Sequence, residues 1–299
     1  MPIQTRGDGF LDVAMLLETS QPRGRSGWLI YALGAFILLV LTSSILAGRS
    51  SEMAHLVNFL SSLAMVGVIA VMAVITLTAV RAQREEIQRL EAIEELIQLR
   101  RWPAATMMVQ GMLLQPLRTP GSRTQALIFL SSVLSRYGRF DDAIMVQEHL
   151  LNHVRLDPGT QHALRLGRAM AMLRQDHLFD ADRAINELRR DVRQAAQPEA
   201  PDSPPVQSAG LALIEMYRDV KTGHPQEAID TFVRALPALR VQLGHRVSDA
   251  YALLARANDL LARDKEAREA WENATLLAPI SELARRYPEL SVLNGKYQP

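Results

Sequence analysis

The stretch RDKEAREAWENATLLAP, residues 263–279, arranges small side chains around one large ring. Ala267, Trp271 and Ala274 follow one another at spacings of four and three, and Pro279 closes the run. These spacings place the three side chains on one face of a helix. Alanine lets two helix backbones approach closely, and the ring fills the volume beside the contact. The stretch therefore predicts a helix that packs against close neighbours and ends at the proline.

Similar spacings recur upstream. In GHPQEAIDTFVRAL, Ala228 is followed by Phe232 four residues later and by Ala235 seven residues later. The anchor positions are Ala105, Ala143, Ala181, Ala228 and Ala267, separated by 38, 38, 47 and 39 residues, with Ala184 as an alternative anchor in the third unit. Recurrence at this period is typical of stacked helical hairpins. We therefore expect an all-α fold in which residues 81–279 form a helical-hairpin solenoid.

Two stretches resemble the tetratricopeptide repeat family in their order of aromatic, small and proline positions. They are YALLARANDLLARDKEAREAWENATLLAP, residues 251–279, and LIFLSSVLSRYGRFDDAIMVQEHLL, residues 127–151. The resemblance covers about residues 85–279, although the spacings exceed the usual 34 residues of that family. It implies a right-handed solenoid with a concave groove that binds peptides or protein segments.

A weaker similarity links RYGRFDDAIMVQEHLL and the segment after it to the family of lipopolysaccharide assembly protein B. Members of that family tether cytoplasmic repeats to a membrane through an N-terminal span. The chain departs from them because it has two long apolar segments and no cysteine, so it cannot carry their rubredoxin-like metal module. The similarity is therefore one of architecture.

Two apolar segments near the N-terminus predict a transmembrane hairpin. Residues 28–47 and 56–80 contain no charged side chain. Each is long enough, at about 1.5 Å per residue, to cross a hydrocarbon layer of about 30 Å. A cleaved signal peptide is the alternative for the first segment, but its apolar run is longer than usual and Ile45 stands where cleavage favours a small residue. Residues 48–55 are expected to connect the spans, and residues 1–27 to precede them in the cytoplasm.

The distribution of basic residues predicts the orientation of this hairpin. Arginines flank the pair of spans on both outer sides, whereas the connector contains a single one. These residues are Arg6, Arg23 and Arg25 before the spans, Arg49 between them, and Arg81, Arg84 and Arg89 after them. Cytoplasmic flanks carry the excess of Lys and Arg. We therefore expect a multi-pass protein of the plasma (inner) membrane with both termini in the cytoplasm.

Three further segments complete the expected domain organisation. No Gly or Pro interrupts residues 81–100, so the second span is expected to continue into the cytoplasm as one amphipathic helix. Oligomerisation could use the spans or this helix. Residues 194–209 are rich in proline and predict an insertion between hairpins. Residues 280–299 predict a C-terminal capping helix and tail.

Composition and motifs argue against several functional classes. The net charge of +1 and the lack of a basic stripe give no reason to expect nucleic acid. Phosphate loops, dinucleotide fingerprints and nucleophile elbows are missing from the sequence, so we expect neither an enzyme nor a bound cofactor. His149 and His153, four residues apart beside Glu148, have a spacing that could hold a metal, but the sequence supplies no third ligand.

The candidate peptide groove consists of five residues near the ends of the first helices of the hairpins. They are Arg136, Arg174, Tyr217, Lys221 and Arg256. In the family that the chain resembles, these helices line the concave face. Four cations and one aromatic ring would suit an acidic or C-terminal peptide. The alternative is that these cations are solvated residues balanced by nearby aspartates.

Two functions remain open at this point. The first is a membrane-anchored scaffold or adaptor that binds partner proteins or peptides at the cytoplasmic face. The second is an assembly or regulatory subunit of a membrane complex, which docks through its transmembrane hairpin. A stripe of small residues in the second span, Ala64, Gly67, Ala70 and Ala73, would suit contact with another helix.

Overall fold

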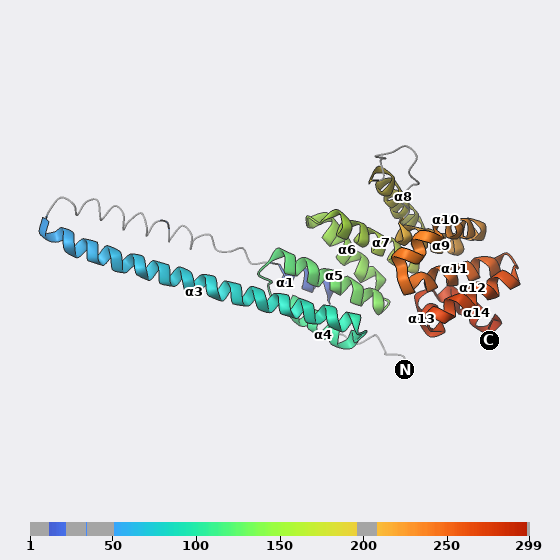
Figure 1. The fold of residues 1–299 in the computed structure, drawn as a ribbon, viewed down its shortest axis with the longest axis horizontal. Helices are drawn as coiled ribbons and strands as arrows, with labels where there is room; N and C mark the ends of the chain where they lie inside the picture. The colour runs from blue at the N-terminus through green and yellow to red at the C-terminus, as the bar shows by residue number, and fades with distance from the viewer. Residues whose placement is uncertain (1–11, 22–33, 35–50, 196–207, 298–299) are drawn as a thin grey trace. The chain divides into compact units, whose positions relative to one another are not determined.

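The computed structural model describes residues 12–21, 34, 51–195 and 208–297. Within these ranges the secondary structure is helical and contains no strand, which confirms the all-α expectation for this part of the chain (Figure 1). The first predicted span, residues 28–47, lies outside the described residues apart from Gly34. The chain divides into a first unit, residues 1–133, and a second unit, residues 134–299.

The first unit is built on one long helix. Its elements are α1 (Val13–Thr19), α3 (Ser51–Gln98), α4 (Trp102–Leu113) and most of α5 (Pro120–Arg136). The second predicted span and residues 81–98 lie in α3 without interruption, which confirms that the span continues as a single helix. α3 begins at Ser51, within the expected connector of residues 48–55. The residues from Ser51 onward include no Gly or Pro before Gly67 that would stop a helix.

α3 is the one helix of the described residues that is long and apolar enough to cross a membrane. This assignment rests on length and composition. None of the apolar stretch that meets the criterion is buried against the rest of the protein. With 48 residues, α3 extends about 72 Å at 1.5 Å per residue. Its last turns pack against α4 and bury Ile93.

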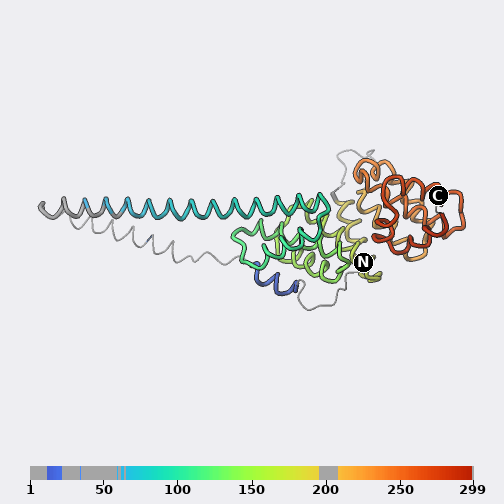
Figure 2. Tube along the Cα trace, turned by 90° about the horizontal axis from the view of Figure 1, so that it is seen from below, coloured from blue at the N-terminus to red at the C-terminus, as the bar shows by residue number. Residues whose placement is uncertain are grey.

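The second unit consists of consecutive helices that pack in pairs. Its elements are α6 (Phe140–His153), α7 (Pro158–Arg174), α8 (Leu178–Ala195), α9 (Ala209–Thr222), α10 (Pro225–Leu243), η1 (Gly244–Arg246), α11 (Val247–Leu260), α12 (Asp264–Leu277), α13 (Ile280–Arg286), η2 (Pro288–Leu290) and α14 (Ser291–Lys296). α7 packs on α8, α9 on α10, and α11 on α12, so each pair forms a helical hairpin (Figure 2). α9 also contacts both α7 and α11.

The turns that precede the anchor helices share one backbone geometry. A residue with left-handed φ lies five positions before each anchor alanine: Arg100 (59°), Gly138 (74°), Asp176 (60°), Gly223 (78°) and Ala262 (57°). The following N–H donates to the carbonyl five residues back, as in Arg263 N to Asn258 O at 2.9 Å. These hydrogen bonds satisfy carbonyl groups that have no partner within the helix, because they lie in its last turn. The recurrence of this turn places Ala181, rather than Ala184, at the position equivalent to the other anchors.

The alanines and rings selected from the sequence lie in the core. All seven alanines of this set are fully buried: Ala105, Ala143, Ala181, Ala228, Ala235, Ala267 and Ala274. The side chains of Phe232 and Trp271 are also buried, with exposed fractions of 6% and 1%. Both boundaries of the predicted proline-rich insertion, residues 194–209, differ from expectation. Residues 194 and 195 belong to α8 and Ala209 belongs to α9, while residues 196–207 lie outside the described part.

Candidate functional site

The first candidate site is the face that α7, α9 and α11 share, here called the inner face. It is represented by Arg174 on α7, Tyr217 and Lys221 on α9, and Asp249 on α11. Residues 280–297, here called the C-terminal segment, contact this face through α13, η2 and α14. The chain therefore covers its own inner face.

A carboxylate of the C-terminal segment occupies the polar part of the inner face. The hydroxyl of Tyr217 lies 3.2 Å from both carboxylate oxygens of Glu289. The ammonium of Lys221 lies 3.1 Å from Glu289 Oε1, 2.7 Å from Asp176 and 2.5 Å from the Leu173 carbonyl oxygen. These three acceptors match the three donors of the ammonium group. Burial, and then the charge of Glu289, raise the pKa of the Tyr217 hydroxyl, so this hydroxyl remains a donor.

An aromatic ring fills the apolar part of the same face. The side chain of Tyr287 is fully buried, and its ring meets the ring of Tyr217 edge to face with 4.9 Å between centroids. The guanidinium of Arg174 lies 5.8 Å from the centroid of the Tyr287 ring, within cation–π range. The Tyr287 hydroxyl lies 3.4 Å from a carboxylate oxygen of Asp249, whose other oxygen pairs with Arg286 at 2.5 Å. The ring is thereby fixed from three helices.

The far end of the C-terminal segment is held by two aspartates. Lys296 Nζ lies 2.8 Å from Asp259 and 2.6 Å from Asp264, and the Tyr297 hydroxyl lies 2.7 Å from Asp264. Arg256 pairs with Asp259 on the same helix. Burial by itself would raise the pKa of Asp259, but hydrogen bonds from Lys296 and Arg256 outweigh it and lower this pKa.

The five residues of the predicted groove do not gather in one place. Arg174, Tyr217 and Lys221 surround Tyr287 and Glu289, whereas Arg256 lies near the other end of the segment. Arg136 lies half-buried in the last turn of α5. Sequence reasoning assigned residues 280–299 to a cap and did not foresee that they would meet the groove residues. The signal was present in RYPEL, residues 286–290, where a tyrosine and a glutamate stand two apart after a pair of arginines.

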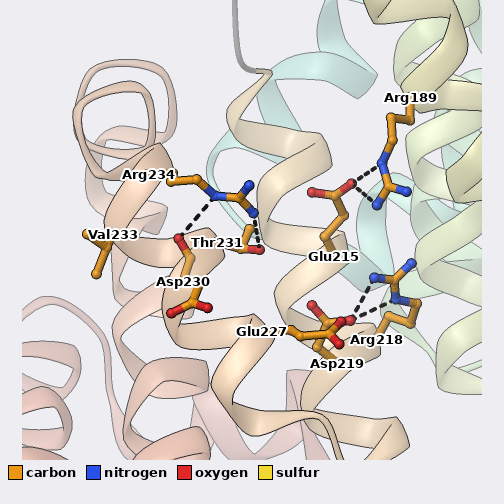
Figure 3. Close-up of a pocket in the computed structure, with 9 residues that line it drawn as sticks. All are labelled: Arg189, Glu215, Arg218, Asp219, Glu227, Asp230, Thr231, Val233 and Arg234. Carbon is orange, nitrogen blue, oxygen red and sulfur yellow. Dashed lines mark hydrogen bonds and ion pairs between the residues drawn. The ribbon is translucent and has the colours of Figure 1, made fainter.

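The second candidate site is a cleft of about 640 Å³ between α8, α9 and α10, here called the outer cleft (Figure 3). Its lining residues are Arg189, Glu215, Arg218, Asp219, Glu227, Asp230, Thr231, Val233 and Arg234. Sequence reasoning missed this site, because its residues share no motif and come from three helices.

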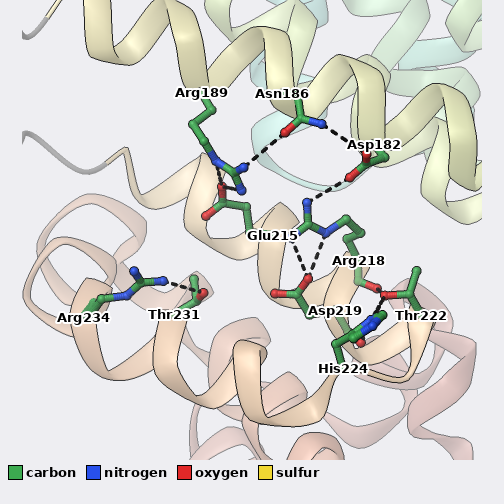
Figure 4. A network of polar contacts seen from close by, with 10 residues as sticks. All are labelled: Asp182, Asn186, Arg189, Glu215, Arg218, Asp219, Thr222, His224, Thr231 and Arg234. Atoms are coloured by element: carbon green, nitrogen blue, oxygen red, sulfur yellow. Dashed lines mark hydrogen bonds and ion pairs between the residues drawn. The ribbon is translucent and has the colours of Figure 1, made fainter.

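The floor of the outer cleft carries two nearly buried carboxylates, each paired with an arginine (Figure 4). Arg189 donates to Glu215 through Nε at 2.9 Å and through Nη2 at 2.6 Å. Arg218 binds Asp219 at 2.7 Å and Asp182 at 3.0 Å. Burial chiefly raises the pKa of Asp219, and the neighbouring charges of Glu227 and Glu215 add to this rise, while Arg218 opposes it.

The α10 wall of the outer cleft presents charges without ion pairs in the described residues. Arg234 donates to the Asp230 carbonyl oxygen at 3.3 Å and to the Thr231 hydroxyl at 3.2 Å, but to no carboxylate. Asp230 accepts only from the neutral amide of Gln226 at 2.9 Å, and Glu227 points from α10 toward Asp219 (Figure 3). The cleft thus offers both signs of charge to a ligand.

The histidine pair considered from the sequence adopts a stacked arrangement. The rings of His149 and His153 lie 4.8 Å apart, and His153 Nδ1 lies 3.1 Å from the His149 carbonyl oxygen. The described residues contain no group of three or more His, Cys, Asp or Glu side chains arranged to hold a metal ion.

Comparison of the chain with models of known protein families, with curated proteins and with solved structures gave no match. The tetratricopeptide resemblance therefore stays a prediction from the sequence. The recurring turn and the buried alanines are properties of this chain itself.

Proposed function

We propose that the protein is a membrane-anchored helical-repeat adaptor that holds a partner protein at the cytoplasmic face of the membrane. The observation that carries the proposal is the outer cleft, which is open and lined by charges on both walls. Glu227, Asp230 and Arg234 have no opposite charge of their own in the described residues, so a partner can supply one.

The chemistry of the outer cleft suits a protein segment better than a small apolar ligand. Pockets for small molecules are mainly apolar with a few polar groups. Here seven of the nine lining residues are charged, and Val233 is the only aliphatic one. Charged surfaces of this kind select partners and steer their approach.

The anchoring role is supported by α3 and by contacts of α1. α3 has the length and composition of a span. α1 precedes the first predicted span, yet it packs against α4, which follows α3. Arg123 of α5 also donates to the Leu17 carbonyl oxygen at 2.8 Å and to the Ser20 hydroxyl at 3.1 Å.

These contacts favour two crossings of the bilayer. α1 and α4 touch and must therefore lie on the same side of any membrane that α3 crosses. The chain between them would have to cross once more, and the uncharged residues 28–47 are suited to that crossing. The flanking arginines favour the cytoplasm as the shared side.

The adaptor proposal is tested by reversing charges in the outer cleft of the full-length protein. Glu227→Lys combined with Arg234→Glu keeps the net charge and alters exposed side chains only. Crosslinking in intact membranes, followed by mass spectrometry, is expected to lose partners that the wild type captures. The matched control is Lys265→Glu with Glu269→Lys, an exposed pair on α12. Retention of every partner by the cleft variant would exclude the outer cleft as the binding site.

A second candidate function is supported by the uncovered surface of α3. The apolar stretch of α3 is not buried against the rest of the protein. The small residues Gly67, Ala70 and Ala73 leave room there for a neighbouring helix. This surface would suit an assembly subunit that docks within the membrane. Replacing residues 28–80 by an unrelated hairpin distinguishes the two functions, because an adaptor keeps its partners and a membrane-docked subunit loses them.

A further inference from the structure

The C-terminal segment has the properties of a peptide bound to a receptor. α13 has seven residues and α14 has six, far below the length at which an isolated helix is stable in water. Their helical structure therefore depends on the surface beneath them. That surface is a set of longer helices, α7, α9 and α11, which pack against one another independently of the segment.

We propose that the C-terminal segment is an intramolecular ligand, and that the inner face, once the segment leaves, binds a partner peptide of the same chemistry. That chemistry is an aromatic ring followed two residues later by a carboxylate, as in Tyr287 and Glu289. This inference concerns the inner face and does not depend on the outer cleft.

The specificity follows from the groups that the segment meets. Departure of Glu289 would leave the Tyr217 hydroxyl without its acceptor and the Lys221 ammonium, whose side chain is 11% exposed, with one acceptor fewer. Buried donors left unpaired favour a ligand that replaces the acceptor. Departure of Tyr287 would open the space between Tyr217 and Arg174, which an aromatic ring fills with favourable edge and cation contacts.

Competition within the chain sets the expected affinity. A tethered ligand acts at an effective concentration of about 1 mM. A free peptide with the same contacts therefore binds only the small open fraction, and its apparent affinity falls by that fraction. Partners that are themselves concentrated at the membrane, or that make additional contacts, are the ones able to displace the segment.

The first test uses the unmodified protein. Native-state hydrogen exchange of the full chain in detergent is expected to show that amides of residues 280–297 exchange at least 10-fold faster than those of α11 and α12. Such behaviour means that the segment opens by itself. Equal protection in the segment and in these helices would overturn the proposal, because the segment would then open only when the unit unfolds.

The second test uses a labelled synthetic peptide of residues 280–297 as the probe. Glu289→Lys in the full chain weakens the internal ligand, so the probe is expected to bind this variant at least 10-fold more tightly than the wild type. Glu272→Lys on the exposed side of α12 is the matched control. A probe that carries Lys at the position of Glu289 is expected to bind at least 10-fold more weakly than the native probe.

The conservative variant Glu289→Gln guards against simple loss of folding. Its amide oxygen still accepts from the Tyr217 hydroxyl, so it is expected to keep an exchange pattern closer to that of the wild type than Glu289→Lys does. Absence of any gain in probe binding for Glu289→Lys, or loss of protection in Glu289→Gln as large as in Glu289→Lys, would overturn the proposal. Charge reversal in the outer cleft is expected to leave probe binding unchanged. The proposal for the inner face and the proposal for the outer cleft are therefore tested by separate experiments.

Discussion

Ala262 adopts the same left-handed backbone conformation as Gly223 at the equivalent hairpin turn, with φ of 57° and 78°. For an alanine this conformation costs about 1 kcal/mol, whereas a glycine adopts it freely. Ala262→Gly is therefore expected to stabilise the α11–α12 hairpin by about 0.5–1 kcal/mol, and Gly223→Ala to destabilise α9–α10 by about 1 kcal/mol. Amide exchange of the affected helices measures both changes. A destabilising Ala262→Gly would contradict the argument.

Trp271 is expected to be the most sensitive single side chain of the last hairpin. It is 1% exposed and lies among the fully buried Ala267 and Ala274. Removing so large a buried ring leaves a cavity, and Trp271→Ala should cost about 3–5 kcal/mol. Leu276→Ala, on a side chain that is 81% exposed, is the control and should change stability by less than about 0.5 kcal/mol. Chemical denaturation of both variants, followed by circular dichroism, compares the two losses.

The buried alanines of the paired helices could be predicted from the sequence because their physical requirement is strict. Close packing of helices requires small side chains at fixed offsets, so the anchor alanines could be recognised in the sequence by their spacing. The residues with left-handed φ in the turns could be recognised from the sequence only in part. Two of the five are glycines, while Arg100, Asp176 and Ala262 adopt the same φ without the residue that would have marked it.

The sites could be predicted less well because they depend on contacts between distant segments. Arg174 on α7, and Tyr217 and Lys221 on α9, were selected from the sequence as groove residues, and all three lie beside the C-terminal segment. Their occupant, Tyr287 with Glu289, lies about 70 residues beyond Lys221, and helical periodicity carries no information on such a separation. The same limit applies to the outer cleft, since Arg189 and Arg234 line one cleft only after three helices have packed.

Acidification is expected to loosen the far end of the C-terminal segment. Hydrogen bonds from Lys296 lower the pKa of Asp264, and together with Arg256 they outweigh burial to lower that of Asp259. A carboxyl group with a lowered folded-state pKa stabilises the fold above its unfolded pKa of about 3.9. This contribution is lost as the pH falls through the folded-state values.

The variant Lys296→Met tests that linkage. Its stability deficit relative to the wild type should be complete at pH 7, should begin to shrink near pH 4, and should disappear once the pH has fallen through the lowered folded-state pKa values of the two aspartates. Carboxyl NMR titration should show both aspartate pKa values moving upward in the variant. A deficit that is independent of pH would mean that Lys296 acts through packing of its alkyl chain.

Arg123 is expected to hold α1 against the body of the first unit. Its guanidinium bridges the Leu17 carbonyl oxygen and the Ser20 hydroxyl, which lie at the C-terminal end of α1. α1 has only seven residues, so it is not stable without such contacts. Hydrogen bonds from a charged donor contribute about 1.5–3 kcal/mol, and their loss should speed amide exchange in α1 about 10- to 150-fold.

Arg123→Ala should therefore expose residues 13–20 to exchange and to added protease while α4 keeps its protection. Arg118→Ala is the matched control, because within the described residues only the backbone N–H of Arg118 is bonded, to Glu86 at 2.8 Å. Unchanged exchange in α1 of Arg123→Ala would show that burial of Val13 and Leu16 alone is enough to hold it.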